Sequence, residues 1–235
     1  MVMTSSVDAI LLCGGKGVRL RPLTETLPKP LVPIKGEPIL GHILDHLSSS
    51  PIEHYYIAGG YEINKIHEYF LSYSLKEKKV TIVDTGEAEI IKRIYSCAKL
   101  IKSDGFLVLY GDTLADINIK QLLQFHASHN GLATITLWPM RSPFGVMEVG
   151  SQGRVESYLE KPILNKWINI GFFYFSSELI SKMKSFEKFE DFIEYLIIKQ
   201  ELYAFKHTGK HITVNTLQEL NDAEQNIDSL KANHE

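Results

Sequence analysis

The chain has 235 residues, a length that suits one large domain and falls short of two full domains. Hydrophobic residues make up 44% and charged residues 23% of the chain, which excludes wholesale disorder, collagen-like repeats and low-complexity chains. The formal net charge of -3 argues against nonspecific binding to nucleic acid or to an anionic membrane, so any positive site must be local.

The two cysteines, Cys13 and Cys97, are too few for a disulfide framework or a structural zinc site. The amino-terminal stretch has no basic segment, and its apolar run Ala9–Cys13 is too short for a signal peptide or a membrane span. We therefore expect a soluble cytoplasmic protein with no nucleic-acid or membrane partner.

Short apolar runs rich in β-branched and aromatic residues predict strands along the whole chain. These runs are Ala9–Leu12, His54–Ala58, Val80–Val83, Phe106–Tyr110, Ala133–Trp138, Val146–Val149, Val155–Leu159 and Ile168–Phe175. Apolar residues at three and four spacing predict helices over Pro38–Leu47, Glu62–Tyr73, Ala88–Ile101, Glu187–Gln200 and Leu217–Leu230. The polar tail near Lys231–Glu235 is predicted to be disordered.

Strands and helices alternate through the first half of the chain, a pattern typical of βαβ units. We therefore predict an α/β fold in which a Rossmann-like, mainly parallel mixed sheet has helices on both faces. After about residue 132 the strands follow one another closely, which indicates a small antiparallel addition in the second half. We expect residues 1–235 to form a single domain.

The segment CGGKGVRLRPLT, Cys13–Thr24, directly follows the first predicted strand. Its glycines allow close approach of the backbone to an anion, and Arg19 and Arg21 add positive charge. No G-K-[ST] ends this loop, and Leu20 replaces the third glycine of a dinucleotide-binding fingerprint. Because ligands bind at the carboxyl ends of parallel strands, we predict a triphosphate-sized anion site here.

A second cationic loop, Leu27–Leu40, follows. Pro28 and Pro30 flank Lys29 and stiffen the segment that presents its ammonium group. The alternative is an ordinary surface loop in which the prolines only end the preceding segment.

In order and spacing, five segments resemble the sugar-1-phosphate nucleotidyltransferase family, closest to its glucose-1-phosphate cytidylyltransferase branch. They are GGKGVRLRPLTETLPKPLVPIKGEPIL at Gly14–Leu40, YGDTLADINIKQLLQFHASHNGLATIT at Tyr110–Thr136, FGVMEV at Phe144–Val149, VESYLEKP at Val155–Pro162 and WINIGFFYF at Trp167–Phe175. The resemblance implies a GT-A-like arrangement, with a nucleotide-binding part over about 8–131 and a sugar-phosphate part over about 132–230. It also implies condensation of a nucleoside triphosphate with a sugar 1-phosphate, with Mg²⁺ as cofactor and pyrophosphate as second product.

By this resemblance the nucleotide contacts residues at the ends of several strands. They are Leu12, Gly14, Gly15, Gly17, Arg19, Lys29, Thr85 and Gly111. Arg19 and Lys29 are the expected catalytic cations on the phosphates, and Asp112 is the expected catalytic Mg²⁺ ligand. Independently of the family, a carboxylate at the end of a parallel strand suits a hard cation. The alternative role for Asp112 is that of a turn or helix cap.

The same resemblance implies the sugar-phosphate contacts. Lys161 matches the lysine on the sugar phosphate, and Glu160 beside it could order Lys161 or meet sugar hydroxyls. Asn169 matches a sugar-hydroxyl ligand, because its amide donates and accepts at once. Lys92 is a further expected substrate contact.

Three departures from the family pattern affect these expectations. Asn215 stands where the second metal ligand is usually an aspartate, so it is expected to offer a neutral carbonyl oxygen and weaker Mg²⁺ binding. Glu89 and Ile90 replace a glycine pair near the nucleobase, and Ile170 replaces a small residue after Asn169. Both changes leave the identity of the base and the sugar open.

We expect in-line attack of the sugar phosphate on the α-phosphorus of the triphosphate, with no covalent protein intermediate. CTP is the favoured nucleotide. Alternatives are the same chemistry with GTP, dTTP, UTP or a non-sugar phosphomonoester, and a nucleotide-binding regulatory protein without turnover. Homo-oligomer formation stays open, because no heptad or exposed stripe selects an assembly.

Overall fold

The computed structural model describes residues 6–75 and 78–231, and its centre is a seven-stranded mixed sheet. The strand order is β12, β8, β11, β6, β1, β4, β5. The bounds are β1 Val7–Leu12, β4 Ile52–Gly59, β5 Lys79–Asp84, β6 Gly105–Tyr110, β8 Ala133–Arg141, β11 Ile163–Ser176 and β12 Leu202–Lys206. Of these strands, β11 alone runs antiparallel to its neighbours, so the sheet is mainly parallel.

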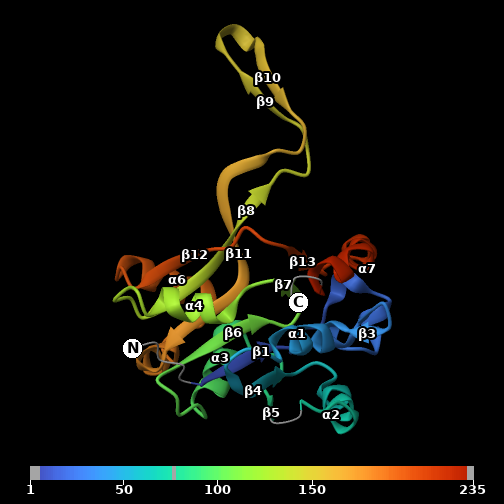
Figure 1. Cartoon of the computed structure of the whole chain (residues 1–235), viewed down its shortest axis with the longest axis vertical. Helices are drawn as coiled ribbons and strands as arrows, with labels where there is room; N and C mark the ends of the chain where they lie inside the picture. Colours follow the sequence, from blue (N-terminus) through green and yellow to red (C-terminus); the bar gives the residue numbers. More distant parts are fainter. Residues whose placement is uncertain (1–5, 76–77, 232–235) are drawn as a thin grey trace.

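Helices cover both faces of this sheet (Figure 1). The helices of one apolar cluster are α1 Ile39–Leu47, α2 Ile63–Ser72, α4 Ile119–His126 and α7 Leu217–Lys231; those of the other are α3 Ile90–Ala98, α5 Ile180–Met183 and α6 Phe189–Ile198. Side chains alternate between the two faces along β1, so Leu11 packs into the first cluster and Ile10 into the second. The predicted Rossmann-like sheet with helices on both faces is confirmed. Within the described residues, none of the helices has the length and apolarity needed to cross a membrane.

Three short antiparallel ribbons decorate the sheet. They are β2 Pro33–Ile34 with β3 Glu37–Pro38, β7 Thr113–Ala115 with β13 His211–Thr213, and β9 Val146–Val149 with β10 Val155–Leu159. The third ribbon stands well away from the rest of the molecule (Figure 1). The predicted small antiparallel addition in the second half is therefore confirmed.

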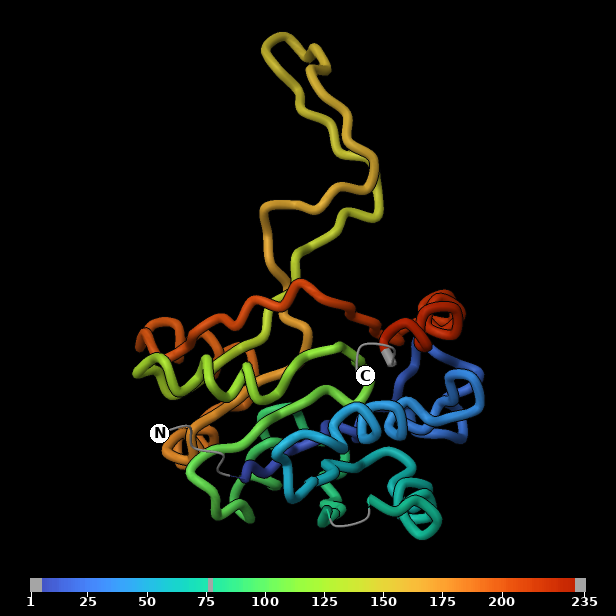
Figure 2. Tube along the Cα trace, in the orientation of Figure 1, coloured from blue at the N-terminus to red at the C-terminus, as the bar shows by residue number. Residues whose placement is uncertain are grey.

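The carboxyl-terminal helix packs beside the amino-terminal loops. Figure 2 shows α7, in red, next to the blue segment that holds β2 and β3. Leu220, Ala223 and Ile227 of α7 share an apolar cluster with Ile34 of β2, and Lys35 Nζ lies 2.5 Å from the carboxylate of Asp228. This packing brings the end of the chain next to the loops that precede α1.

Every predicted helix is present, with ends within three residues of the predicted bounds. The pattern missed α4, α5 and β12. It also missed β2, β3, β7 and β13, which have two or three residues each and are too short to show a periodicity. At the chain's end, Lys231 is the last residue of α7, and residues 232–235 of the predicted disordered tail lie outside the described part.

The packing of α4 makes one histidine sensitive to acid. Nδ1 of His126 lies 2.9 Å from Thr134 Oγ1, and burial together with nearby His129 lowers the pKa of His126 to about 4. The folded pKa is below the ordinary value of 6.5, so protonation opposes folding. The stability from neutral His126 is thus complete above pH 6.5 and is lost as the pH falls toward 4.

We predict that His126→Gln, which keeps a hydrogen-bonding side chain, reduces this acid sensitivity. Between pH 7 and 4.5, the free energy of unfolding should fall less in this variant than in the wild type, by on the order of 2 kcal/mol. Urea denaturation at the two pH values measures the difference, and exposed His67→Gln is the control. An acid loss of equal size in His126→Gln and the wild type would contradict the prediction.

Candidate functional site

The loop after β1 needs glycine at two positions for different reasons. Gly17 has φ +60°, a left-handed conformation, and the Thr24 hydroxyl donates to its carbonyl oxygen at 2.8 Å. At Gly14, a Cβ atom would lie 1.6 Å from Nη1 of Arg93. Both glycines are therefore required by the local fold, and the anion site expected at this loop stays a prediction.

Lys29 is the centre of a polar cluster at this edge of the sheet. Its ammonium group forms an ion pair with the carboxylate of Asp112 and donates to Oδ1 of Asn215 at 2.9 Å. Nη2 of Arg19 donates to the same Asn215 oxygen at 2.9 Å. The structure thus brings together Arg19, Lys29, Asp112 and Asn215, which the sequence analysis selected from distant segments.

The β7–β13 ribbon sets the distance between Asp112 and Asn215. Asp112 follows the end of β6, and its carbonyl oxygen accepts from Val214 N at 3.2 Å. Thr113 is paired with Thr213, and the Thr213 hydroxyl accepts from the amide nitrogen of Asn215 at 3.0 Å. The amide oxygen of Asn215 consequently faces the two cations.

The start of α7 fixes the backbone beside Asn215. Thr216 and Glu219 form a capping box, in which the Glu219 carboxylate accepts from Thr216 N at 3.0 Å and the Thr216 hydroxyl accepts from Glu219 N at 3.2 Å. The same carboxylate accepts from Asn215 N at 2.6 Å. Asn215 therefore lies on rigid backbone.

The donor set at this cluster suits a divalent cation. Asp112 Oδ2 and Asn215 Oδ1 converge on one cationic nitrogen, that of Lys29. Mg²⁺ in phosphate-binding sites prefers oxygen ligands and usually takes one or two from the protein. Within the described residues, no group of three or more His, Cys, Asp or Glu side chains forms a metal site of the all-protein kind. The two oxygens of Asp112 and Asn215 therefore suit a cation whose other ligands are phosphate oxygens.

Arg93 packs against Gly14 of the loop after β1 and was not among the predicted site residues. The residue is 9% exposed, and its guanidinium group donates to the carbonyl oxygen of Ala88 at 2.7 Å and to the Thr85 hydroxyl at 2.8 Å. Thr85 in turn donates to the carbonyl oxygen of Gly59 from both its backbone nitrogen, at 2.9 Å, and its hydroxyl, at 2.5 Å. Burial lowers the pKa of Arg93 from its usual high value. Arg93 thus joins the predicted Thr85 segment to the end of β4.

Asn169 lies at the same edge of the sheet, one strand beyond Asp112. Its Oδ1 accepts from the backbone nitrogen of Gly171 at 2.9 Å. Burial raises the pKa of the neighbouring Tyr110 hydroxyl, and a hydrogen bond with Asn169 partly opposes that rise. The exposed amide of Asn169 is therefore oriented by its own strand.

Three predicted substrate residues lie outside the Lys29 cluster. Glu160 and Lys161 are exposed at the base of the β9–β10 ribbon, where the Tyr158 hydroxyl donates to the Glu160 carboxylate. Lys92 points to the α5–α6 connection and forms an ion pair with Glu187 at 2.8 Å. Among the described residues, none of the three has a hydrogen bond or ion pair to Asp112 or Asn215.

Lys206 is a further cation near Asn169 that the sequence analysis did not select. Both residues pair with Leu137 of β8, so their side chains lie on one face of the sheet. Nζ of Lys206 lies 4.9 Å from the centre of the Trp167 ring. The sequence signal for Lys206 is a lysine at the end of β12, a strand that the apolar pattern did not predict.

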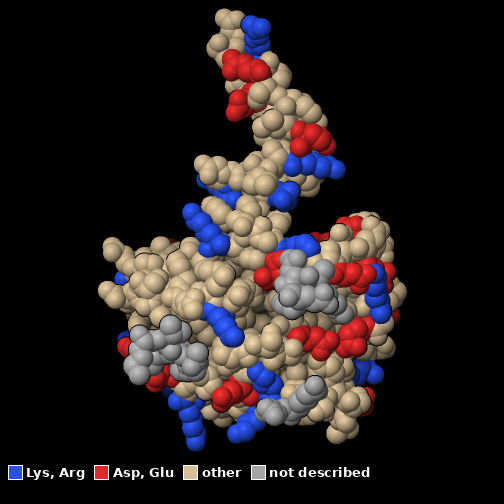
Figure 3. All heavy atoms as spheres, in the orientation of Figure 1, with Lys and Arg blue, Asp and Glu red and all other residues tan. Residues whose placement is uncertain are grey.

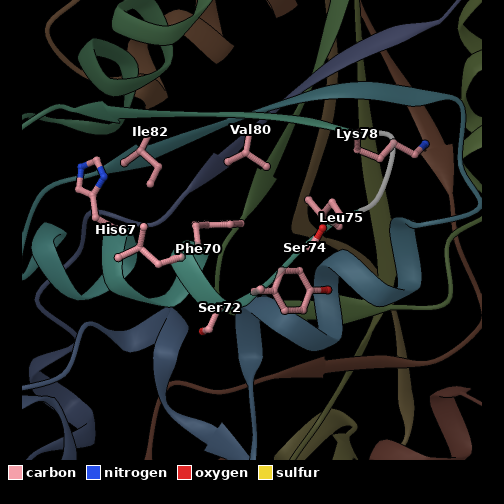
Figure 4. Close-up of a pocket in the computed structure, with 10 residues that line it drawn as sticks. His67, Phe70, Ser72, Ser74, Leu75, Lys78, Val80 and Ile82 are labelled. Carbon is pink, nitrogen blue, oxygen red and sulfur yellow. The ribbon is translucent and has the colours of Figure 1, made fainter.

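Two hollows lie outside the Lys29 cluster. One, of about 530 Å³, borders it, because its lining includes Thr213 and Glu219 as well as Trp138 and Arg141. The other, of about 600 Å³, lies between α2 and β5 and is lined by none of the predicted site residues (Figure 4).

Comparison with known proteins identifies relatives over nearly the whole chain. A family model described as nucleotidyl transferase matches residues 8–227. The chain is 31% identical to a probable glucose-1-phosphate cytidylyltransferase of Bacillus subtilis and 33% identical to a glucose-1-phosphate cytidylyltransferase of Salmonella typhimurium; each alignment covers 91% of this chain and 93% of the relative. A solved structure of a putative glucose-1-phosphate thymidylyltransferase from Bacillus anthracis is 21% identical, with a TM-score of 0.77 over 94% of each chain. The structural likeness shows that the two chains share a fold.

The buried position of Arg93 generates a prediction about stability. We predict that Arg93→Ala lowers the free energy of unfolding by about 2 kcal/mol, because the partly buried Thr85 and Ala88 oxygens lose their donor. Urea denaturation measures the change. Arg154→Ala, at an exposed turn, is the control and should change the free energy of unfolding by less than about 0.5 kcal/mol. An equal change in the two variants would show that the hydrogen bonds of Arg93 do not stabilise the fold.

Proposed function

The chain belongs to the nucleotidyl transferase family, and from this premise we propose that it transfers the cytidylyl group of CTP to a sugar 1-phosphate and releases pyrophosphate. It is a sugar-1-phosphate nucleotidyltransferase. The finer assignment, to CTP and to a glucose-like acceptor, is supported by the similarity to the probable glucose-1-phosphate cytidylyltransferase of Bacillus subtilis and the glucose-1-phosphate cytidylyltransferase of Salmonella typhimurium.

The observation that carries this proposal is the convergence of Arg19, Lys29, Asp112 and Asn215 beside the glycine loop. Two cations and one carboxylate give the cluster a surplus of positive charge, which suits a triphosphate. The backbone of Gly14, Gly15 and Gly17, with Leu12 and Gly111 at the neighbouring strand ends, would contact the nucleotide, and Thr85 would lie on its base side. Arg19 and Lys29 would stabilise the charge that develops on the leaving pyrophosphate.

Asp112 and Asn215 are the residues that would hold Mg²⁺, through one carboxylate and one amide oxygen. When bound, the metal ion supplies charge neutralisation on the phosphates. The residues of the chain supply orientation, because the phosphate-monoester oxygen of the acceptor must lie in line with the leaving pyrophosphate. No protein nucleophile takes part in this scheme.

The acceptor would bind beside this cluster, along β11 and the base of the β9–β10 ribbon. Asn169 is suited to a vicinal diol, and Lys161 to the sugar phosphate with Glu160 beside it. Lys206 is a second cation on the face of the sheet that carries Asn169. Lys92 would reach an acceptor only after leaving its ion pair with Glu187.

The first experiment measures Mg²⁺-dependent release of pyrophosphate. CTP with glucose 1-phosphate should give the highest kcat/KM among ATP, CTP, GTP, UTP and dTTP tested with several phosphomonoesters. Asp112→Ala should lower kcat/KM about 100- to 1,000-fold, because a charged group at the reacting phosphates is removed. Exposed Asp104→Ala is the matched control and should retain activity.

Two other results would redirect this proposal. Faster turnover with another base or another acceptor would replace CTP or the sugar while keeping the chemistry. Binding of a nucleotide in calorimetry, with no pyrophosphate from any combination, would favour a regulatory protein without turnover.

A second experiment tests whether Asn215 is a metal ligand. We predict that Asn215→Ala raises the Mg²⁺ concentration for half-maximal activity about tenfold, and that Asn215→Asp, which adds a negative charge, lowers it. Gln218→Ala is the control, because Gln218 is exposed on α7 and its side chain bonds to Asp222, away from Asn215. Unchanged Mg²⁺ dependence in both Asn215 variants would remove this residue from the metal site.

A further inference from the structure

The triphosphate group cannot decide which nucleotide binds, because CTP, UTP and GTP carry the same phosphates. Their bases are uncharged, and Figure 3 shows acidic and basic side chains interspersed on the visible face of the molecule, so charge there favours no base over another. Selection among the bases must therefore come from individual polar groups, and these groups must lie where the base lies.

The order of the strands indicates on which side of the glycine loop the base would lie. In the sheet this order is β11, β6, β1, β4, β5. Asp112 follows β6, and the proposed acceptor residue Asn169 lies on β11. In the proposed reaction the sugar phosphate attacks from that side of β1, so the nucleoside would extend the opposite way, toward the ends of β4 and β5.

An exposed ion pair lies on the side of β4 and β5. Nζ of Lys16, in the glycine loop after β1, lies 2.5 Å from a carboxylate oxygen of Glu87, which follows β5. Because β4 lies between β1 and β5, the pair reaches across the end of β4. Among the ion pairs of the described residues, this one alone joins the glycine loop to the segment after β5.

Open space lies next to both partners of this ion pair. The side chains of Lys16 and Glu87 are 49% and 76% exposed. At Gly15 and Gly86, their neighbours in the chain, a Cβ atom would meet no other atom within 4 Å. The loops after β4 and β5 also pack through their backbones, since a Cβ atom at Gly60 would lie 2.3 Å from the Gly86 carbonyl oxygen. A flat base therefore has room beside the Glu87 carboxylate.

The carboxylate of Glu87 suits one pyrimidine better than the other. Its hydrogen bond with Lys16 lowers the pKa of Glu87, so the group is charged at neutral pH and only accepts hydrogen bonds. Cytosine has an exocyclic amino group, which donates, at the position where uracil and thymine have a carbonyl oxygen, which accepts. A carboxylate placed at this edge of the base attracts cytosine and repels uracil.

We propose that Glu87 selects cytosine by accepting a hydrogen bond from its exocyclic amino group, and that Lys16 positions the Glu87 carboxylate. This inference rests on the proposed function for the place of the phosphates. It gives the base a side-chain contact in the same segment in which Glu89 and Ile90 replace the glycine pair expected near the nucleobase.

Calorimetric binding of CTP and of UTP to the full chain, with Mg²⁺, tests the role of Glu87. The wild type should bind CTP about tenfold more tightly than UTP. In Glu87→Gln the ratio of the two Kd values should fall to about one, because an amide both accepts and donates and so suits either base.

Glu68→Gln is the matched control, because Glu68 is exposed on α2, outside both loops, and this variant should keep the wild-type ratio. A wild type that does not prefer CTP would overturn the proposal. An unchanged ratio of Kd values in Glu87→Gln would overturn it as well.

A second variant tests whether Lys16 acts through Glu87. Lys16→Met should lower the ratio of Kd values about threefold, and the double variant Lys16→Met with Glu87→Gln should have the ratio of Glu87→Gln alone. A further fall in the double variant would refute the positioning role of Lys16. Urea denaturation should give equal midpoints for the wild type and these variants, since both side chains are exposed.

Release of pyrophosphate separates this inference from the proposed function. A wild type that prefers CTP in binding, loses this preference in Glu87→Gln and releases no pyrophosphate would count against the proposed function and leave the base contact intact. Turnover of CTP with equal selectivity over UTP in the wild type and in Glu87→Gln would support the proposed function and refute the role of Glu87.

Discussion

The ammonium group of Lys29 holds the site together, because it lies between the carboxylate of Asp112 and the amide oxygen of Asn215. These residues come from three distant parts of the chain. Because Asn215 is neutral, the cluster pairs two positive charges, on Lys29 and Arg19, with the one carboxylate of Asp112. A chain with a net charge of -3 thereby keeps a locally positive cluster at this edge of the sheet.

Apolar packing and hydrogen bonds both hold the residues of this cluster in place. The apolar face of α7 packs against the same cluster as β2, which fixes the start of the helix, and the capping box then fixes the backbone of Asn215. On the other side, Arg93 fills the space that a side chain at Gly14 would need. The polar groups of the site are therefore positioned by the fold before any phosphate binds.

Local periodicity predicted most of the sheet and five of its helices, whereas short motifs and the family resemblance together selected the Lys29 cluster, with Asn215 chosen by the resemblance alone. Arg93 shows what a pattern leaves unresolved. It follows Ile90 by one helical turn, on the apolar stripe of α3, so the sequence carried the signal of a buried cation. What that cation binds depends on Ala88 and Thr85, in a loop whose conformation the periodicity does not set. Lys92 was placed with the substrate by resemblance alone, and its ion pair with Glu187 depends on how α5 and α6 pack on α3.

The contact between Lys29 and Asn215 spans 186 positions of the chain, and this span has a consequence during synthesis on the ribosome. A nascent chain that has emerged only to β12 already holds the glycine loop, Lys29 and Asp112. It still lacks β13, Asn215 and the helix that positions them. The enzyme therefore acquires its complete site only after β13 and α7 have been made, and a chain truncated before residue 215 keeps the seven-stranded sheet without a complete site.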